Sequence, residues 1–92
     1  RDLMMKSESG QIDNVLVTIV SRKLDLFIDM RCPCHKPVEL LGQEILLLLV
    51  DEFGSEMNKL APIKLSFNNR SIPNGQCLAS VGAWDGSYIY ID

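Results

Sequence analysis

The stretch from Pro37 to Gly54, PVELLGQEILLLLVDEFG, decides the fold of this chain. Its apolar run could be a buried strand by periodicity alone, but together with the flanking apolar residues it is too long for one strand. Six apolar residues follow the i, i+3, i+4 spacing that aligns side chains along one helical face: Val38, Leu41, Ile45, Leu48, Leu49 and Phe53. The stretch therefore predicts one main helix, Pro37 to Phe53, whose apolar face needs a sheet to cover it.

The ends of this helix carry residues typical of helix boundaries. Pro37 suits the first helical position, since its missing N–H would have no intrahelical partner there, and Glu39 places negative charge at the positive end of the dipole. Gly54 can adopt the left-handed conformation that ends a helix. Gly42 is the weak point, because an interior glycine costs about 1 kcal/mol relative to alanine unless something packs closely on it.

Short strand patterns lie on both sides of the helix. Val15–Ser21 is β-branched and Leu24–Met30 alternates, so a hairpin is expected there, and Pro33 is expected to prevent continuation of its second strand. After the helix, a polar link over 55–62 leads to three further strands, separated by a turn at Asn68-Asn69 and by a loop or helical turn near Leu78. These strands are expected over 63–67, 70–72 and 87–91. The predicted order is β-β-α-β-β-β, an α+β fold.

Composition and charge restrict the class of protein. The chain has 92 residues, of which 47% are hydrophobic and 23% charged, which fits one folded domain. A net charge of −3, with nine dispersed basic residues, argues against nucleic acid as a partner. No segment reaches the roughly 18 to 20 apolar residues that span a bilayer, and three cysteines, an odd number, favour reduced thiols in a cytoplasmic protein. We expect residues 1–14 to be a flexible leader and residues 15–92 to be the folded domain.

One constellation, Cys32-Pro33-Cys34-His35, has the chemistry of metal ligands. A structural zinc site normally has four ligands and a wider Cys–Cys spacing, and only Cys77 remains to complete one. A Cys–His nucleophile would need a third group to position the imidazole, and a pocket beside it. The sequence therefore favours a plain loop, and we expect no metal, no cofactor, no catalytic residue and no small-molecule substrate.

From Leu65 onward the chain resembles the β-grasp of ubiquitin. The resemblance consists of an L-x-F strand, an apolar edge residue, a glycine turn, a leucine and a closing apolar-x-apolar strand, carried by Leu65, Phe67, Ile72, Gly75, Leu78, Ile89 and Ile91. Pro37-Val38 and the ending LASVGAWDGSYIYI further resemble the YukD-like (EsaB-like) ubiquitin-related proteins of type VII secretion in Gram-positive bacteria. That ending is carried by Leu78, Gly82, Ala83, Asp85 and Gly86. The ubiquitin-like cytosolic domain of EccD-type membrane proteins has much the same pattern.

The resemblance implies a mixed sheet with one main helix and a function without catalysis. It implies a cytoplasmic adaptor or regulatory component of a type VII (ESX/WXG100) secretion system, acting by protein–protein docking on a component of that machinery or by self-association. The alternatives are the cytosolic headpiece of a larger membrane protein of the same machinery and a small metal-binding domain. Conjugation is not implied, because Asp92 follows the last strand without a flexible Gly-Gly extension. Ser66 and Asp92 replace apolar positions through which ubiquitin is recognised, so binding to ordinary ubiquitin receptors is not implied either.

The sheet face directed away from the helix is the candidate partner-binding surface. If the odd-numbered residues of Val15–Ser21 face the core, the even-numbered ones point outward, and aromatic side chains of two other strands join them if the strands are neighbours as in ubiquitin. Exposed aromatic clusters mark partner sites more often than isolated exposed residues do. The alternative is that the leader or a neighbouring domain covers these side chains. The predicted partner-binding residues are Leu16, Val20, Phe27, Tyr88 and Tyr90.

Overall fold

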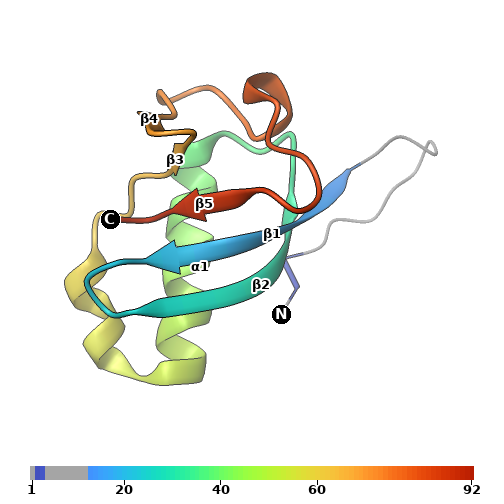
Figure 1. Cartoon of the computed structure of the whole chain (residues 1–92). Coiled ribbons are helices and arrows are strands. Elements are labelled where there is room, and N and C mark those ends of the chain that lie inside the picture. The colour runs from blue at the N-terminus through green and yellow to red at the C-terminus, as the bar shows by residue number, and fades with distance from the viewer. Residues whose placement is uncertain (1, 4–12) are drawn as a thin grey trace.

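The computed structural model describes residues 2–3 and 13–92, which form a five-stranded mixed sheet with one long helix on one of its faces (Figure 1). The elements are β1 (Asn14–Ser21), β2 (Leu26–Pro33), α1 (Val38–Phe53), the 3₁₀ helix η1 (Ser55–Leu60), β3 (Ser66–Phe67), β4 (Arg70–Ser71), the 3₁₀ helix η2 (Ala79–Val81) and β5 (Tyr88–Tyr90). The strand order is β2-β1-β5-β3-β4, with β1 and β5 parallel and the other neighbours antiparallel. The predicted α+β class and element order are confirmed.

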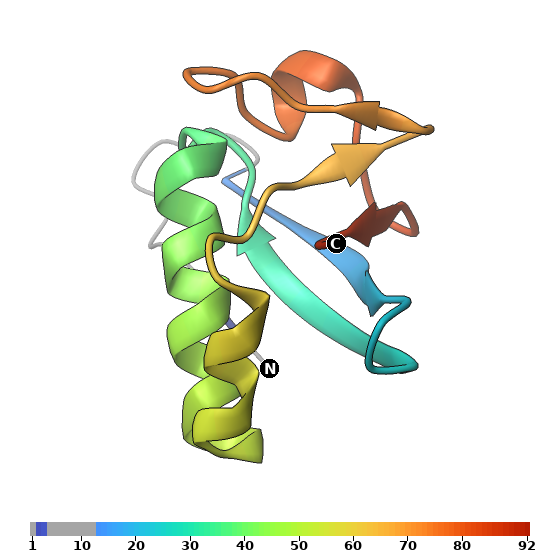
Figure 2. The same ribbon diagram turned by 90° about the vertical axis from the view of Figure 1, so that its left-hand side faces the viewer.

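α1 lies against one face of the sheet, as Figure 2 shows from the side, and the side chains of the core lie between them. The sheet contributes alternate apolar residues, namely Val15, Val17, Ile19, Ile28, Met30 and Ile89. The helix contributes the i, i+3, i+4 face that the sequence predicts, with Val38, Leu41, Ile45 and Leu49 buried. Phe53 is the exception at 42% exposure, because the last turn of α1 extends beyond the β2 edge of the sheet (Figure 1). Leu48 is only partly buried, so the buried face is centred on Leu49.

Gly42 is buried in α1 because another segment packs closely on it. A Cβ added there would lie 2.9 Å from the carbonyl oxygen of Ile63, closer than real Cβ contacts come. The segment before β3 therefore crosses the helix at the position where the helix has no side chain. The glycine that looks weak by helix propensity is required by packing.

Three sequence expectations about strands and links are corrected. The second strand does not end at Met30 but continues to Pro33, which is its last residue and lies opposite Asn14. β2 is an edge strand, and a proline is tolerated on an edge strand where its missing N–H faces away from the neighbouring strand. The third and last strands are shorter than expected, at two and three residues. The polar link after α1 is not a simple loop, because it forms η1, whose Leu60 joins the core.

The Asp85-Gly86 turn connects the last strand to the first. The Oδ1 atom of Asp85 accepts a hydrogen bond of 2.8 Å from the backbone N–H of Leu16. Gly86 has a positive φ of 88° and its N–H donates to the carbonyl oxygen of Leu16. A short carboxylate and a glycine are thus both needed here, which explains why this dipeptide precedes the parallel β1–β5 pair.

The predicted flexible leader, residues 1–14, falls mostly on residues 1 and 4–12, which lie outside the described part of the chain. Of its described residues, Asn14 begins β1. Asp2 forms an isolated parallel bridge with Arg31 of β2, and the N–H of Leu3 donates to the carbonyl oxygen of Arg31 at 2.7 Å.

Candidate functional site

The strand register brings the predicted partner-binding residues together on the face of the sheet opposite α1. Directly paired residues point to the same face of a sheet. Val20 lies between Phe27 of β2 and Tyr90 of β5, and Thr18 lies between Asp29 and Tyr88. Leu16 lies beside Arg31 at one end of these rows. We call this surface the outer sheet face and define it by Leu16, Thr18, Val20, Phe27, Asp29, Arg31, Tyr88 and Tyr90.

Exposure divides the five predicted residues into two groups. Phe27 is 64% exposed, Tyr88 55% and Leu16 44%, while Tyr90 is half-buried. Val20 is only 2% exposed, which corrects the expectation that it is available for contact. It does not belong to the main core cluster, and its cross-strand neighbours on the outer sheet face are Phe27 and Tyr90. Val20 therefore supports the exposed side chains from below.

Polar contacts join neighbouring strands on the outer sheet face and join the β1–β2 turn to Tyr90 of β5. The hydroxyl of Thr18 donates to Asp29 Oδ1 at 2.8 Å, and the guanidinium of Arg22 lies 4.3 Å from the centroid of the Tyr90 ring. A cation over an aromatic face is attracted to it, so Arg22 covers part of Tyr90. This half-buries one aromatic residue and leaves Phe27 and Tyr88 as the large exposed ones.

Asp92 holds the β1–β2 turn to the end of the last strand. Its carboxylate accepts hydrogen bonds from the hydroxyl of Ser21 and from the backbone N–H groups of Arg22 and Lys23. Burial alone would raise the pKa of Asp92, but these hydrogen bonds and the charge of Lys23 outweigh it and lower the pKa below its ordinary value of 3.8. The ionised side chain thus joins two segments that are far apart in the sequence.

A hollow of about 460 Å³ adjoins the outer sheet face at its β5 side. Its lining comes from the two tyrosines of β5, the turn before β5, and the β3–β4 turn: Phe67, Asn68, Asn69, Gly86, Ser87, Tyr88 and Tyr90. Asn68 and Asn69 have positive φ angles of 51° and 64°, so the predicted Asn-Asn turn is confirmed. A side chain from a partner could enter this hollow beside Tyr88.

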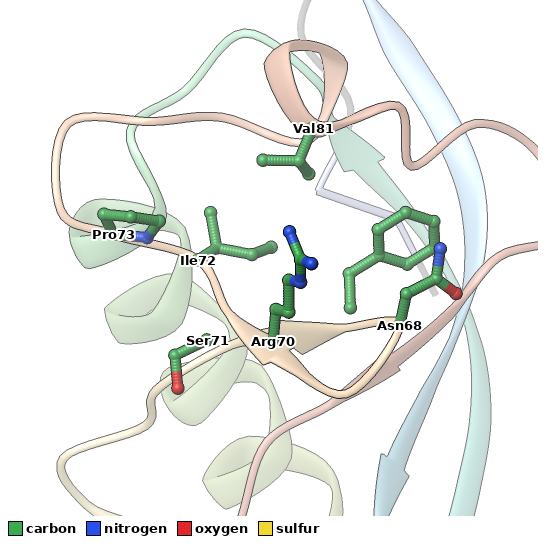
Figure 3. Close-up of a pocket in the computed structure, with 7 residues that line it drawn as sticks. Asn68, Arg70, Ser71, Ile72, Pro73 and Val81 are labelled. Carbon is green, nitrogen blue, oxygen red and sulfur yellow. The ribbon is translucent and has the colours of Figure 1, made fainter.

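A larger pocket of about 670 Å³ lies on the other side of the β3–β4 hairpin, and the sequence interpretation missed it (Figure 3). Phe67, Ile72, Pro73 and Val81 give it apolar walls, and Arg70 extends from β4 toward Val81. The remaining described lining residues are Asn68 and Ser71, so among the residues that the structure describes Arg70 is the only titratable group lining the pocket. The described lining therefore holds no pair of an acid and a base of the kind that proton-transfer chemistry needs. The sequence signal that could have located it is the arginine directly after the Asn-Asn turn.

The Cys-Pro-Cys-His stretch is not the plain loop that the sequence favours. Cys32 belongs to β2, and both Cys32 and Cys34 are buried in the hydrophobic core, whereas His35 is exposed. Burial raises the pKa of the Cys32 thiol to about 12, and the negative charge of Glu44 adds to the effect. Within residues 2–3 and 13–92, no three His, Cys, Asp or Glu side chains lie close enough to hold a metal ion.

Two acidic side chains of α1 have structural partners. Glu39 Oε1 accepts a hydrogen bond of 3.0 Å from the N–H of Gly75, which lowers the pKa of Glu39 and ties the start of the helix to the loop before η2. Glu44 forms an ion pair of 2.7 Å with Lys36.

No helix in the described part of the chain is long and apolar enough to cross a bilayer.

The sheet order, the parallel β1–β5 pair and the single helix on the inner face define the ubiquitin-like β-grasp, as predicted. No protein-family model and no curated protein matches the chain. Among solved structures, the ubiquitin-like domain of EccD5 from Mycobacterium xenopi is similar, with a TM-score of 0.63 and 14% identity over 83% of this chain and 91% of that one. At this identity the likeness establishes the fold.

Two further structures share the fold. A de novo design based on ubiquitin has a TM-score of 0.60 and 11% identity, covering 89% of this chain and 90% of the design. The N-terminal ubiquitin-like domain of the 4931431F19Rik protein also has a TM-score of 0.60, with 10% identity, covering 97% of this chain and 83% of that one.

Proposed function

We propose that this domain is a non-enzymatic, ubiquitin-like adaptor or regulatory component of a bacterial type VII secretion machinery, and that it docks on another protein component in the cytoplasm. The observation that carries the proposal is the outer sheet face, on which Phe27, Tyr88 and Leu16 are exposed, one in each of three successive cross-strand rows. The link to type VII secretion rests on the Asp85-Gly86 ending of the sequence and on the shared fold with the EccD5 domain.

The chemistry of this face suits protein binding. Interfaces are enriched in aromatic side chains at their centre, and a buried aromatic anchor commonly contributes about 2 kcal/mol or more, roughly thirtyfold in affinity. Phe27 and Tyr88 can supply two such anchors without refolding, since the pairing of β2, β1 and β5 already fixes the backbone beneath them. Asp29 and Arg31, both exposed on the same face, supply the charged rim.

A second candidate within the same machinery is the cytosolic headpiece of a larger membrane protein. The likeness to an EccD5 ubiquitin-like domain favours this reading. The two candidates differ in the reading frame after Asp92, because transmembrane segments there would identify a headpiece and a stop codon would identify an independent adaptor. In both cases the outer sheet face is the proposed docking surface and the domain is not conjugated to targets.

The test is a replacement of the native copy in cells, followed by measurement of secreted type VII substrates. The variant Phe27→Ser/Tyr88→Ser should reduce secretion at least about tenfold, as expected for the loss of two anchors. The matched control is Leu47→Ser, which removes an equally exposed apolar side chain, 69% exposed, from α1. It should secrete normally, with all proteins present in equal amounts by immunoblot. Normal secretion by the double variant would contradict the proposal.

A further inference from the structure

The open edge of β2 is guarded by only two residues of the described chain. Asp2 and Leu3, which we call the strap, lie against Arg31. The Leu3 N–H donates to the Arg31 carbonyl oxygen at 2.7 Å, and an Asp2 carboxylate oxygen lies 3.5 Å from Arg31 Nε. The Leu3 side chain is partly buried against the core. The strap thus contacts the strand through its backbone, its charge and its apolar packing.

The hydrogen bonds of β1 show which β2 groups face outward along this edge. Leu16, Thr18 and Val20 direct their backbone groups to β5 and the turn before it. The alternate β1 residues therefore pair with β2, and in an antiparallel ladder this leaves the backbone groups of Phe27, Asp29 and Arg31 on the open side. Apart from the strap, no described segment pairs with β2 on that side. An edge of this length is a template for another strand.

Charge selects one way for two copies of β2 to pair through this edge. In an antiparallel pair, residues with outward-facing backbone groups lie opposite one another. If Asp29 is opposite Asp29, or Arg31 opposite Arg31, like charges meet, which is destabilising. A register centred on Met30 instead places Asp29 of each copy opposite Arg31 of the other, twice by symmetry. Pro33 then lies opposite Phe27, where its carbonyl accepts from the Phe27 N–H, while the Phe27 carbonyl has no donor from Pro33 and faces solvent at the end of the pair.

We propose that the strap is a guard that keeps β2 from pairing with β2 of a second copy in this register. Both polar contacts described for the strap are with Arg31, which in this register pairs with Asp29 of the second copy. The Asp2 carboxylate contacts the Arg31 guanidinium, to which the Asp29 carboxylate of the second copy would bind. The Leu3 N–H donates to the Arg31 carbonyl oxygen, to which the Asp29 N–H of the second copy would donate. Release of the strap therefore removes both of these contacts together and allows a continuous ten-stranded sheet with two outer sheet faces side by side.

The test is analytical ultracentrifugation of the full chain over a concentration series. Leu3→Pro removes the strap donor, and Leu3→Ala is its matched control, because it keeps the N–H while losing the side chain. Leu3→Pro should dimerise with a dissociation constant at least about tenfold below that of the wild type, as loss of a competing hydrogen bond and of the packing predicts. Leu3→Ala should lie between them. If Leu3→Pro does not fold, Asp2→Ala is the alternative variant, and its dimer dissociation constant should fall below that of the wild type by a smaller factor than the one given for Leu3→Pro.

The register is tested by charge reversal in the Leu3→Pro background. Adding Arg31→Asp should abolish the dimer, because an aspartate would then face Asp29 of the second copy. The same change removes the ion pair with Asp2, so loss of the dimer would not be due to a restored strap. Adding Asp29→Arg as well should recover the dimer with the charges exchanged. A Leu3→Pro protein that stays monomeric at every concentration overturns the proposal, and so does a dimer that is insensitive to Arg31→Asp.

Discussion

The two faces of the sheet are built by the same strands and by similar residues, yet they differ in what covers them. On the inner face, Val17 and Ile19 are sealed under α1. On the outer sheet face, Leu16 of the same strand is exposed, whereas Val20 is buried although it lies outside the main core cluster. Alternation along a strand therefore decides which face a residue belongs to, but its burial depends on what lies across that face. The inner face stabilises the domain, and the outer face is available for a partner.

The largest expected effect is on the helix that covers the inner face. Leu49→Ala should lower the free energy of unfolding by about 2 to 5 kcal/mol, because it leaves a cavity at a fully buried position. Leu47→Ala, on the exposed side of the same helix, should change it by less than about 0.5 kcal/mol. Urea denaturation of both variants measures the difference. Equal losses would show that the two sides of α1 are equally covered.

A smaller effect is expected where the backbone itself packs on the helix. Gly42→Ala should destabilise the domain by about 1 to 3 kcal/mol, since the added methyl would meet the Ile63 carbonyl and force a shift. Helix propensity alone predicts the opposite sign, a gain of about 1 kcal/mol. Thermal denaturation decides between the two signs, and a stabilised variant would mean that the segment before β3 gives way easily.

A still smaller effect should appear at the hairpin end of the outer sheet face. The folded-state pKa of Asp92 is lowered, so its contribution to stability is complete above the ordinary pKa of 3.8 and is lost as the pH falls through the folded-state value. Asp92→Asn should therefore cost at most about 1 kcal/mol at pH 7, because solvent screens this exposed carboxylate. The difference from the wild type should be smaller at pH 3 than at pH 7, because protonation of the unfolded state begins below the ordinary pKa of 3.8. Urea midpoints at both pH values test this, and a constant difference would exclude ionisation as the cause.

The smallest stability change is expected for the exposed aromatic residues. Phe27→Ser and Tyr88→Ser remove cross-strand contacts that are worth about 0.2 to 1 kcal/mol each, and they leave no core cavity. The double variant should give the wild-type far-UV circular dichroism spectrum and unfold cooperatively. Tyr90→Ser should lower the free energy of unfolding more than Tyr88→Ser, since Tyr90 is the cross-strand neighbour of the buried Val20 and its ring contacts the Arg22 guanidinium. Global unfolding of the double variant would place these residues in the core.

Much of the fold could be predicted because local signals agreed with one another. The spacing of Val38, Leu41, Ile45 and Leu49 indicated the helix and its buried face, and all four are buried. The Asn68-Asn69 and Asp85-Gly86 turns were recognisable because their residues tolerate or require positive φ angles. Phe53 was misassigned, because periodicity does not tell where the sheet ends beneath the helix.

The parts that could not be predicted depend on contacts between distant segments. The role of Gly42 depends on Ile63, which passes over it from another segment. Pro33 is tolerated in β2 because β2 is at the edge of the sheet. The order of the strands in the sheet cannot be predicted from the sequence of a single segment. Val20 was placed on the correct face of β1, but its burial requires the register of both neighbours.

The most direct test of the outer sheet face as the docking surface is site-specific photo-crosslinking in cells of origin. A photoreactive amino acid replaces Phe27 in the full chain, and the control carries it at Leu47, which is similarly exposed on α1. We expect one discrete protein adduct at position 27 that is absent at position 47 and is lost when Tyr88→Ser is added. An adduct at position 47 with none at position 27 would contradict this expectation.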